Sequence, residues 1–266
     1  MSAAFRLEVR RSRSLILWLA IIALAYGTFL AVFYPVFRDN YKLVDQYLSL
    51  FPKELMTAFG MEGSLADPGV FFSTYIGGML WPILAAIAGI GMATRPSAGD
   101  LDRGFLELAL STPLSRVRYM AAAIGGQIVG MAVLAAATVA GIYAAGRIVA
   151  APFDLVGFGL AGAVAWAFGC AIAAVGTLLS VATLNRGLSA GATAGVLIAM
   201  YLAAAIARIQ PDLAWLGDLS AFRYFQATPI IDEGRFPWGD FSVFGVVAVA
   251  AWALSLWTFR RRDLAA

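Results

Sequence analysis

The pattern of hydrophobic positions along the chain is dominated by six long runs without charged residues. They cover 14–37, 68–94, 119–146, 155–185, 187–207 and 241–259. A helix needs about 20 apolar residues to cross a hydrocarbon core roughly 30 Å thick, and open sheets are excluded because unpaired backbone groups in lipid cost several kcal/mol each. We therefore predict an all-α polytopic membrane protein. It is a single transmembrane domain over 1–266, with spans at about 14–37, 70–94, 118–145, 156–182, 187–208 and 240–259.

Composition supports this prediction. Of the 266 residues, 61% are hydrophobic and 13% are charged, whereas a soluble domain carries about 25% charged residues. The first run follows four arginines, as the core of a signal peptide does. Its 24 residues exceed the roughly 7–15 residues of a typical signal core, and no clear small-x-small cleavage site follows. We therefore interpret this run as the first span.

The distribution of basic residues predicts the orientation of the spans. The segments 1–13, 95–118, 183–186 and 260–266 hold 12 of the 19 Lys and Arg residues, and the longer segments on the other side hold the remaining seven. Because cytoplasmic loops are enriched in Lys and Arg, we expect both termini in the cytoplasm. On the other side, 210–240 combines three prolines with Trp215 and Trp238. This mixture predicts a surface-hugging or re-entrant segment.

Several kinds of chemistry are missing from the sequence. Histidine is absent, Cys170 is the only cysteine, and the cores of the six runs contain no Asp, Glu, Lys or Arg. Carriers coupled to protons or ions normally bury such residues along their path, so a proton antiporter is disfavoured, as is an intramembrane metalloprotease. Neither Lys42 nor Lys53, the only lysines, follows a glycine as a phosphate-binding loop requires. We expect no catalytic residue and no metal site, and any active transport must draw its energy from another polypeptide.

The segment between the second and third spans carries the most distinctive pattern. At helical spacing, one face of 100–111 holds Asp100, Arg103, Glu107 and Ser111, and another face is apolar. Pro113 ends this helix, because proline disfavours helical geometry in the residue before it, and Ser115 is placed to cap the third span. We predict a short amphipathic helix at about 100–111, which either docks a soluble partner or merely covers the loop.

The residues of this segment resemble the cytoplasmic signature of the ABC type-2 exporter permease family. The matching pattern is Asp100-x-Asp102-x-Gly104-x-Leu106-Glu107-x3-Ser111-x-Pro113-x-Ser115-Arg116. It departs from the family in having Asp rather than Glu at 100 and 102, Phe105 in place of Thr, and Ala109 in place of a bulkier apolar residue. Residues 5–13 look like the amphipathic elbow helix of the family, and 222–264 resemble its closing pattern.

The resemblance implies a permease (transmembrane) subunit of an ATP-driven exporter in the bacterial cytoplasmic membrane. Two permease copies, identical or related, would form the pathway, and a cytoplasmic ATP-binding subunit under each would bind ATP and Mg, so that this chain holds no cofactor. No nucleic acid partner is implied. The residues expected to couple to the ATPase are Asp100, Asp102, Arg103, Gly104, Phe105, Glu107, Ser111, Pro113, Ser115 and Arg116. Two alternatives remain open: a secondary carrier or channel independent of an ATPase, and a membrane scaffold or assembly protein.

A stripe of small residues follows the fifth span. Gly187, Gly191 and Gly195 recur every four residues and so lie along one helix face. Helices in lipid associate through such surfaces, so the stripe predicts either packing within the chain or a subunit interface beside the pathway. An uncharged path favours an amphipathic or lipid-like cargo, although hydroxyl groups such as those of Thr177 and Ser180 would also serve a polar one.

Overall fold

The computed structural model describes residues 2–52, 56–57, 61, 63–102, 104–105, 114–149 and 153–261. Over these residues the chain is helical and contains no strand. Six helices are long and apolar enough to cross a membrane: Ala4–Asp39, Pro68–Asp102, Arg116–Ile148, Leu155–Thr183, Arg186–Ile209 and Trp238–Arg261. The all-α prediction with six spans is therefore confirmed.

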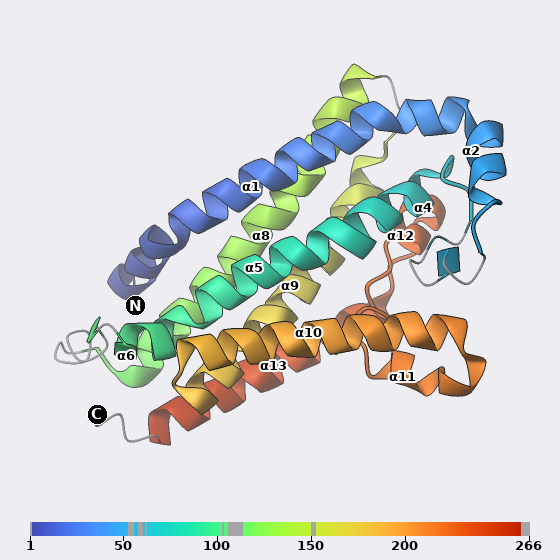
Figure 1. The fold of residues 1–266 in the computed structure, drawn as a ribbon. Coiled ribbons are helices and arrows are strands. Elements are labelled where there is room, and N and C mark those ends of the chain that lie inside the picture. Colours follow the sequence, from blue (N-terminus) through green and yellow to red (C-terminus); the bar gives the residue numbers. More distant parts are fainter. Residues whose placement is uncertain are drawn as a thin grey trace.

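The described elements follow one another in a simple order. They are α1 (Ser2–Asp39), α2 (Tyr41–Leu48), α4 (Pro68–Phe72), η1 (Ser73–Leu80), α5 (Trp81–Ala93), η2 (Arg95–Gly99), α6 (Asp100–Asp102), α8 (Arg116–Ile148), α9 (Leu155–Thr183), α10 (Arg186–Ile209), η3 (Pro211–Leu213), α11 (Trp215–Asp218), α12 (Thr228–Glu233) and α13 (Trp238–Arg261). Helix α1 begins and helix α13 ends at the same end of the bundle as α6, which we call the terminal end (Figure 1). The opposite end carries α2, α4 and α12, and we call it the distal end.

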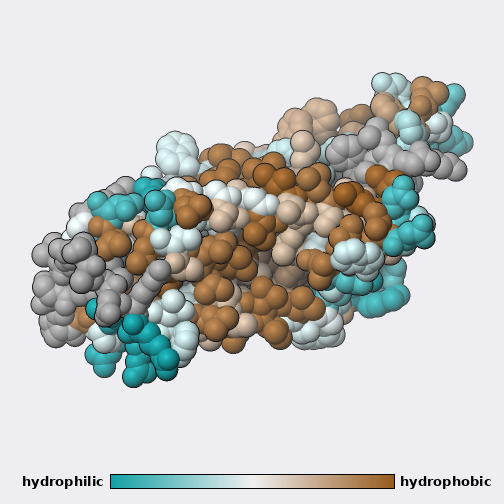
Figure 2. All heavy atoms as spheres, turned by 60° about the horizontal axis from the view of Figure 1, so that its bottom comes forward, coloured by the Kyte–Doolittle hydropathy of each residue, from teal (hydrophilic) through white to brown (hydrophobic). Residues whose placement is uncertain are grey.

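The surface of the bundle matches a membrane environment. Figure 2 shows a broad hydrophobic band around the middle of the molecule, with hydrophilic residues gathered toward both ends. Among the spans, α9 is the most enclosed, with 72% of its most apolar stretch buried, whereas the corresponding figure for α10 is 11%. Helix α9 is therefore the centre of the bundle, and α10 lies largely open at its surface.

Close backbone contact joins α1 to α8. A Cβ atom on Gly27 would lie 2.8 Å from the backbone oxygen of Thr138, and one on Gly141 would overlap the backbone of Leu24. The hydroxyl of Thr28 also donates to the carbonyl oxygen of Gly141 at 3.3 Å. Small residues allow helices in lipid to approach this closely, so the two glycines set the spacing of this pair.

A buried amide ties three spans together in the middle of the bundle. Gln127 of α8 is 1% exposed, and its Nε2 donates to the hydroxyl of Thr177 in α9 at 2.9 Å. Its Oε1 accepts from Nε1 of Trp252 in α13 at 3.0 Å. Both ends of the amide are thereby satisfied without water, as a polar group in a membrane interior requires.

The second span is not one regular α-helix. The π-helical segments η1 and η2 flank α5, and the N–H of Gly99 reaches back five residues to the carbonyl of Thr94 at 2.8 Å. Pro96 explains part of this irregularity, because proline has no backbone N–H to donate to the hydrogen-bond pattern of a regular α-helix. The span then continues through η2 into α6.

The coupling helix predicted at 100–111 falls mostly on residues outside the described part of the chain and stays a prediction. Residues 100–102 are the last turn of the second span, and Gly104 has a φ of +65°, a left-handed conformation that ends helices and suits glycine. Residues 106–113 lie outside the described part of the chain. Residues 5–13, expected as an amphipathic elbow helix, form the first part of α1, which runs unbroken from Ser2 to Asp39.

The segment after α10 folds back into the bundle. Ser220 donates to the carbonyl of Met200 at 2.6 Å, and Met200 lies nine residues before the end of α10, or about 13 Å at 1.5 Å per residue. Phe225 stacks on Phe168 of α9 at 4.6 Å between ring centroids, and Phe222 meets the same ring edge-on at 5.5 Å. Of the two alternatives predicted for this region, the re-entrant one describes it.

A contact between two residues far apart in sequence closes the distal end. Asp232 of α12 accepts a hydrogen bond from the N–H of Gly69 at 2.7 Å, which satisfies one of the free donors in the first turn of α4. Burial raises the pKa of Asp232, and the bond from Gly69 acts in the opposite direction. A side chain on Gly69 would collide with this carboxylate, so glycine is required there.

We predict that Gln127→Leu destabilises the bundle by about 1–2 kcal/mol, because it removes two interhelical hydrogen bonds and leaves the Trp252 N–H without its partner. Thermal unfolding in detergent, followed by circular dichroism, measures the effect. The matched control is Ser255→Ala, since the Ser255 hydroxyl donates to Ala251 within its own helix. Equal melting temperatures for the two variants would contradict a cross-linking role for Gln127.

Candidate functional site

A buried ion pair lies at the terminal end, where the second span meets the first. Nη1 of Arg11 in α1 donates a hydrogen bond to Oδ2 of Asp100 in α6 at 2.8 Å, and Nη2 of the same guanidinium forms an ion pair with Oδ1. The hydroxyl of Tyr119 in α8 donates to the same carboxylate, and the Arg11 guanidinium also lies 4.4 Å above the ring of Phe105. We call these four residues the Asp100 cluster.

Further polar contacts surround the Asp100 cluster. Glu8 lies 3.8 Å from Arg11, and Arg95 donates to the hydroxyl of Ser12 at 3.2 Å. The hydroxyls of Ser97 in η2 and Ser180 in α9 share a hydrogen bond of 2.6 Å. The end of the second span is thus bonded to α1, α8 and α9. A displacement of η2 and α6 must either break these bonds or move the three spans with it.

The structure separates the predicted coupling residues into groups. Asp100 is fully buried, so it contacts its own chain and does not present its carboxylate to a partner. Asp102, Gly104 and Ser115 are exposed, while Phe105 and Arg116 are half-buried. Arg103, Glu107, Ser111 and Pro113 lie outside the described residues.

Ser115 caps the third span, as the sequence predicts. Its backbone is extended, and its hydroxyl accepts a hydrogen bond from the N–H of Arg118 at 3.3 Å. Such a cap satisfies one of the donors that the first turn of a helix leaves free. The chain therefore enters α8 directly after the loop, with the Asp100 cluster beside it.

A second feature is a long groove between α5 and α10. It consists of two cavities of about 860 and 460 Å³ that share Gly78, Tyr201 and Phe222 as lining residues and so adjoin. The larger cavity extends toward the terminal end and includes Arg95 and Arg186. The smaller one lies toward the distal end. Both volumes fall within the roughly 300–1,000 Å³ range that is typical of ligand pockets.

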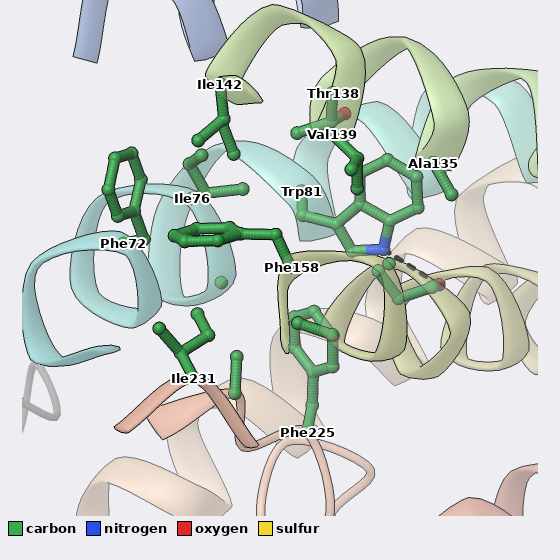
Figure 3. Close-up of a pocket in the computed structure, with 15 residues that line it drawn as sticks. Phe72, Ile76, Trp81, Ala135, Thr138, Val139, Ile142, Phe158, Phe225 and Ile231 are labelled. Atoms are coloured by element: carbon green, nitrogen blue, oxygen red, sulfur yellow. Dashed lines mark hydrogen bonds between the residues drawn. The ribbon is translucent and has the colours of Figure 1, made fainter. Parts of the chain in front are cut away.

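Two further cavities lie elsewhere in the described part of the chain. One of about 310 Å³ lies between α9, α10 and α13 and is lined mostly by apolar side chains. The cavity in Figure 3 measures about 50 Å³ and is lined by rings and aliphatic groups, including Phe72, Trp81 and Phe158. Trp81 Nε1 is satisfied by the carbonyl of Ala165 at 2.9 Å, so this small cavity is a packing void.

The hydroxyl groups suggested for a polar pathway are engaged elsewhere. Thr177 and Ser180 are fully buried; Thr177 bonds Gln127 and the carbonyl of Ala173, and Ser180 bonds Ser97. They are structural contacts between spans. The sequence could not show this, because the partners lie 50 and 83 residues away.

The glycine stripe of the fifth span faces outward. Gly187, Gly191 and Gly195 are all exposed, and a Cβ atom on Gly191 or Gly195 would have nothing within 4 Å. Gly191 lies two helical turns from Ile198, which lines the groove, so the stripe borders the open side of the groove. Of the two alternatives considered, packing within the chain does not account for these glycines.

Comparison with known proteins adds one match. A family model described as ABC-2 family transporter protein matches residues 5–264. No curated protein matches the sequence.

We predict that Asp100→Asn lowers the free energy of unfolding by about 1.5–3 kcal/mol, because it keeps the shape of the side chain but removes the buried charge that accepts from Arg11 and Tyr119, leaving Arg11 with Glu8 at 3.8 Å as its remaining counter-charge. The melting temperature in detergent reports the loss. Asp102→Asn, two residues along and exposed, is the control and should change stability by less than about 0.5 kcal/mol. If the two variants melted together, the ion pair would not hold this end of the bundle.

Proposed function

Because the chain belongs to the ABC-2 transporter family, we propose that it is the permease subunit of an ATP-driven exporter in the bacterial cytoplasmic membrane. The observation that carries the proposal is the family match, which extends over nearly the whole chain. A multi-pass protein with six spanning helices fits that role. The sequence has no lysine in a phosphate-binding loop, so ATP and Mg are bound by a separate subunit.

A second permease copy completes the pathway in this proposal. The groove between α5 and α10 is open along one side, and α10 is the least buried of the described spans. The glycine stripe beside that opening allows another helix to approach closely. A partner helix seated on Gly191 and Gly195 covers the groove and converts it into an enclosed path between two subunits.

The loop at 100–116 receives the force from the ATP-binding subunit. It lies at the terminal end, where Asp102, Gly104 and Ser115 are accessible to a partner. Asp100 acts as a positioning residue, because it is buried and anchors the loop to Arg11 and Tyr119. Phe105 beneath Arg11 continues this anchor into the loop.

Movement of the loop then reaches the groove through the second span. The end of that span is continuous from α5 through η2 to α6, and Ile83, Ile87 and Ile90 of α5 line the groove. A push at 100–105 therefore displaces one wall of the groove. Since the Asp100 cluster also includes residues of α1 and α8, those helices move with it, and the path alternates between its two openings.

Affinity purification in mild detergent, followed by an ATPase assay on the purified material, tests the function. A permease brings down a nucleotide-binding protein, and the complex hydrolyses ATP. Transport activity in vesicles that contain this chain alone indicates a carrier or channel, and recovery of other proteins without ATPase activity indicates a scaffold. Either of these results contradicts the proposal.

We predict that Gly191→Leu weakens association of two permease copies roughly tenfold, equivalent to about 1.4 kcal/mol, because the side chain prevents close approach of the partner helix. Cross-linking yield in nanodiscs measures the change. The fold of the single chain is unaffected, since the new side chain meets nothing within 4 Å.

The control for this variant is Gly245→Leu in α13, another exposed glycine in a span with nothing within 4 Å. It should associate like the unaltered chain. Equal cross-linking yields from the two variants would show that the interface between permease copies does not lie on α10.

We predict that Glu107→Lys reduces stimulated ATPase activity of the complex at least about tenfold, because reversal of a docking charge costs several kcal/mol. Glu107 lies outside the described residues, and the family signature motivates this test. Asp212→Lys reverses an exposed charge at the far end of α10 and leaves the activity intact. Normal stimulation in Glu107→Lys, with an unchanged melting temperature, removes Glu107 from the docking surface.

A further inference from the structure

The groove between α5 and α10 has a one-sided distribution of charge. Four arginines line its two cavities, Arg95 and Arg186 in the larger and Arg208 and Arg223 in the smaller, and neither set of lining residues contains Asp or Glu. Arg223 forms an ion pair with Asp218 outside the smaller cavity. The lining of the groove is therefore basic, and the charge of Arg223 is shared with Asp218.

Two of the arginines lie about one membrane thickness apart along α10. Arg186 opens α10, and Arg208 is in its last turn. Twenty-two residues separate them, which corresponds to about 33 Å of helix, close to the roughly 30 Å thickness of a hydrocarbon core. Each end of the groove is thus placed at the depth of lipid headgroups on one side of the bilayer.

Between the arginines the groove is apolar. Ile83, Ile87 and Ile90 of α5 face Leu197 and Ile198 of α10 across the larger cavity. A small anion without a tail would lose its hydration on entering this stretch and would find no partner there. An alkyl chain instead gains free energy with each methylene group that it buries.

The smaller cavity supplies the additional polar groups that a headgroup needs. Besides Arg208 and Arg223, it is lined by Gln226 and by Thr228, whose hydroxyl shares a hydrogen bond of 2.9 Å with Ser73. Guanidinium groups bind phosphate and carboxylate oxygens through charge-assisted hydrogen bonds. Amide and hydroxyl groups complete such a site.

We propose that the cargo is an anionic amphiphile from the bilayer, with a phosphate or carboxylate headgroup at Arg208 and Arg223 and its acyl chain along the apolar part of the groove. This inference names the substrate class for the proposed permease, and as transport it rests on that function. The binding step is a property of this chain alone. It is therefore tested without the ATP-binding subunit.

Binding to the purified full chain in neutral detergent provides the test. The probes are lysophosphatidylglycerol, lysophosphatidylcholine with the same chain, and inorganic phosphate, each titrated and followed by native mass spectrometry. The anionic lipid should bind at least about tenfold more tightly than the zwitterionic one, which corresponds to one charge-assisted contact, and phosphate should not compete with it.

Two kinds of variant locate the site. The double variant Arg208→Gln with Arg223→Gln should lose the tenfold preference, while Arg147→Gln, an exposed arginine in the last turn of α8 outside the groove, keeps it. Ile87→Trp should weaken binding of both lipids by obstructing the tail, and Val246→Trp on the exposed face of α13 should not. The tail variant keeps the test decisive if the double variant fails to fold.

Equal affinity for the two lipids would overturn the inference, as would effective competition by phosphate or an equal loss in Arg147→Gln. These failures differ from a failure of the proposed function. If no ATPase accompanies the chain but the anionic lipid still binds selectively, the exporter role falls and the binding site remains. If the complex hydrolyses ATP but shows no preference between lipids, the cargo assignment alone falls.

Discussion

The ion pair between Arg11 and Asp100 joins the beginning of the chain to the end of the second span, and the arrangement of the terminal end depends on it. A carboxylate with no exposure at all requires a counter-charge, and Arg11 supplies one through two contacts while Tyr119 contributes a third. Separation of such a pair is costly in a low-dielectric environment. The loop that begins at Asp100 is therefore held against two different spans, α1 and α8.

The second span links this anchor to the groove. Its two π-helical segments interrupt the regular hydrogen-bond ladder on both sides of α5, and such segments are frequent at functional sites. Between them α5 is a regular helix whose isoleucines form one wall of the groove. Loop and groove are consequently two ends of one structural element, and in the proposed function movement of the loop reaches the groove directly.

Much of this architecture follows from local sequence. The six uncharged runs identify the spanning helices, because a helix in lipid must be long and hydrophobic enough to cross it. Ser115 is recognisable as the N-cap of α8 from its position directly before that helix. What depends on distant partners could not be predicted. Asp100 looks like part of a solvated polar face until Arg11, 89 residues earlier, is placed beside it. The left-handed backbone at Gly104 and the gathering of the groove arginines could not be predicted either. Only the folded chain shows the backbone angle and brings α5 and α10 together.

The small buried fraction of α10 has a consequence for biogenesis. Local stability follows the extent of buried contacts, so α10 belongs to the least protected unit of the isolated subunit, while α9 and its neighbours form the cooperative nucleus. In the proposed assembly, α10 therefore gains most of its protection when the second copy covers it. A protomer without that partner would keep this helix as its least protected span, so the proposal ties the abundance of the subunit to that of its complex.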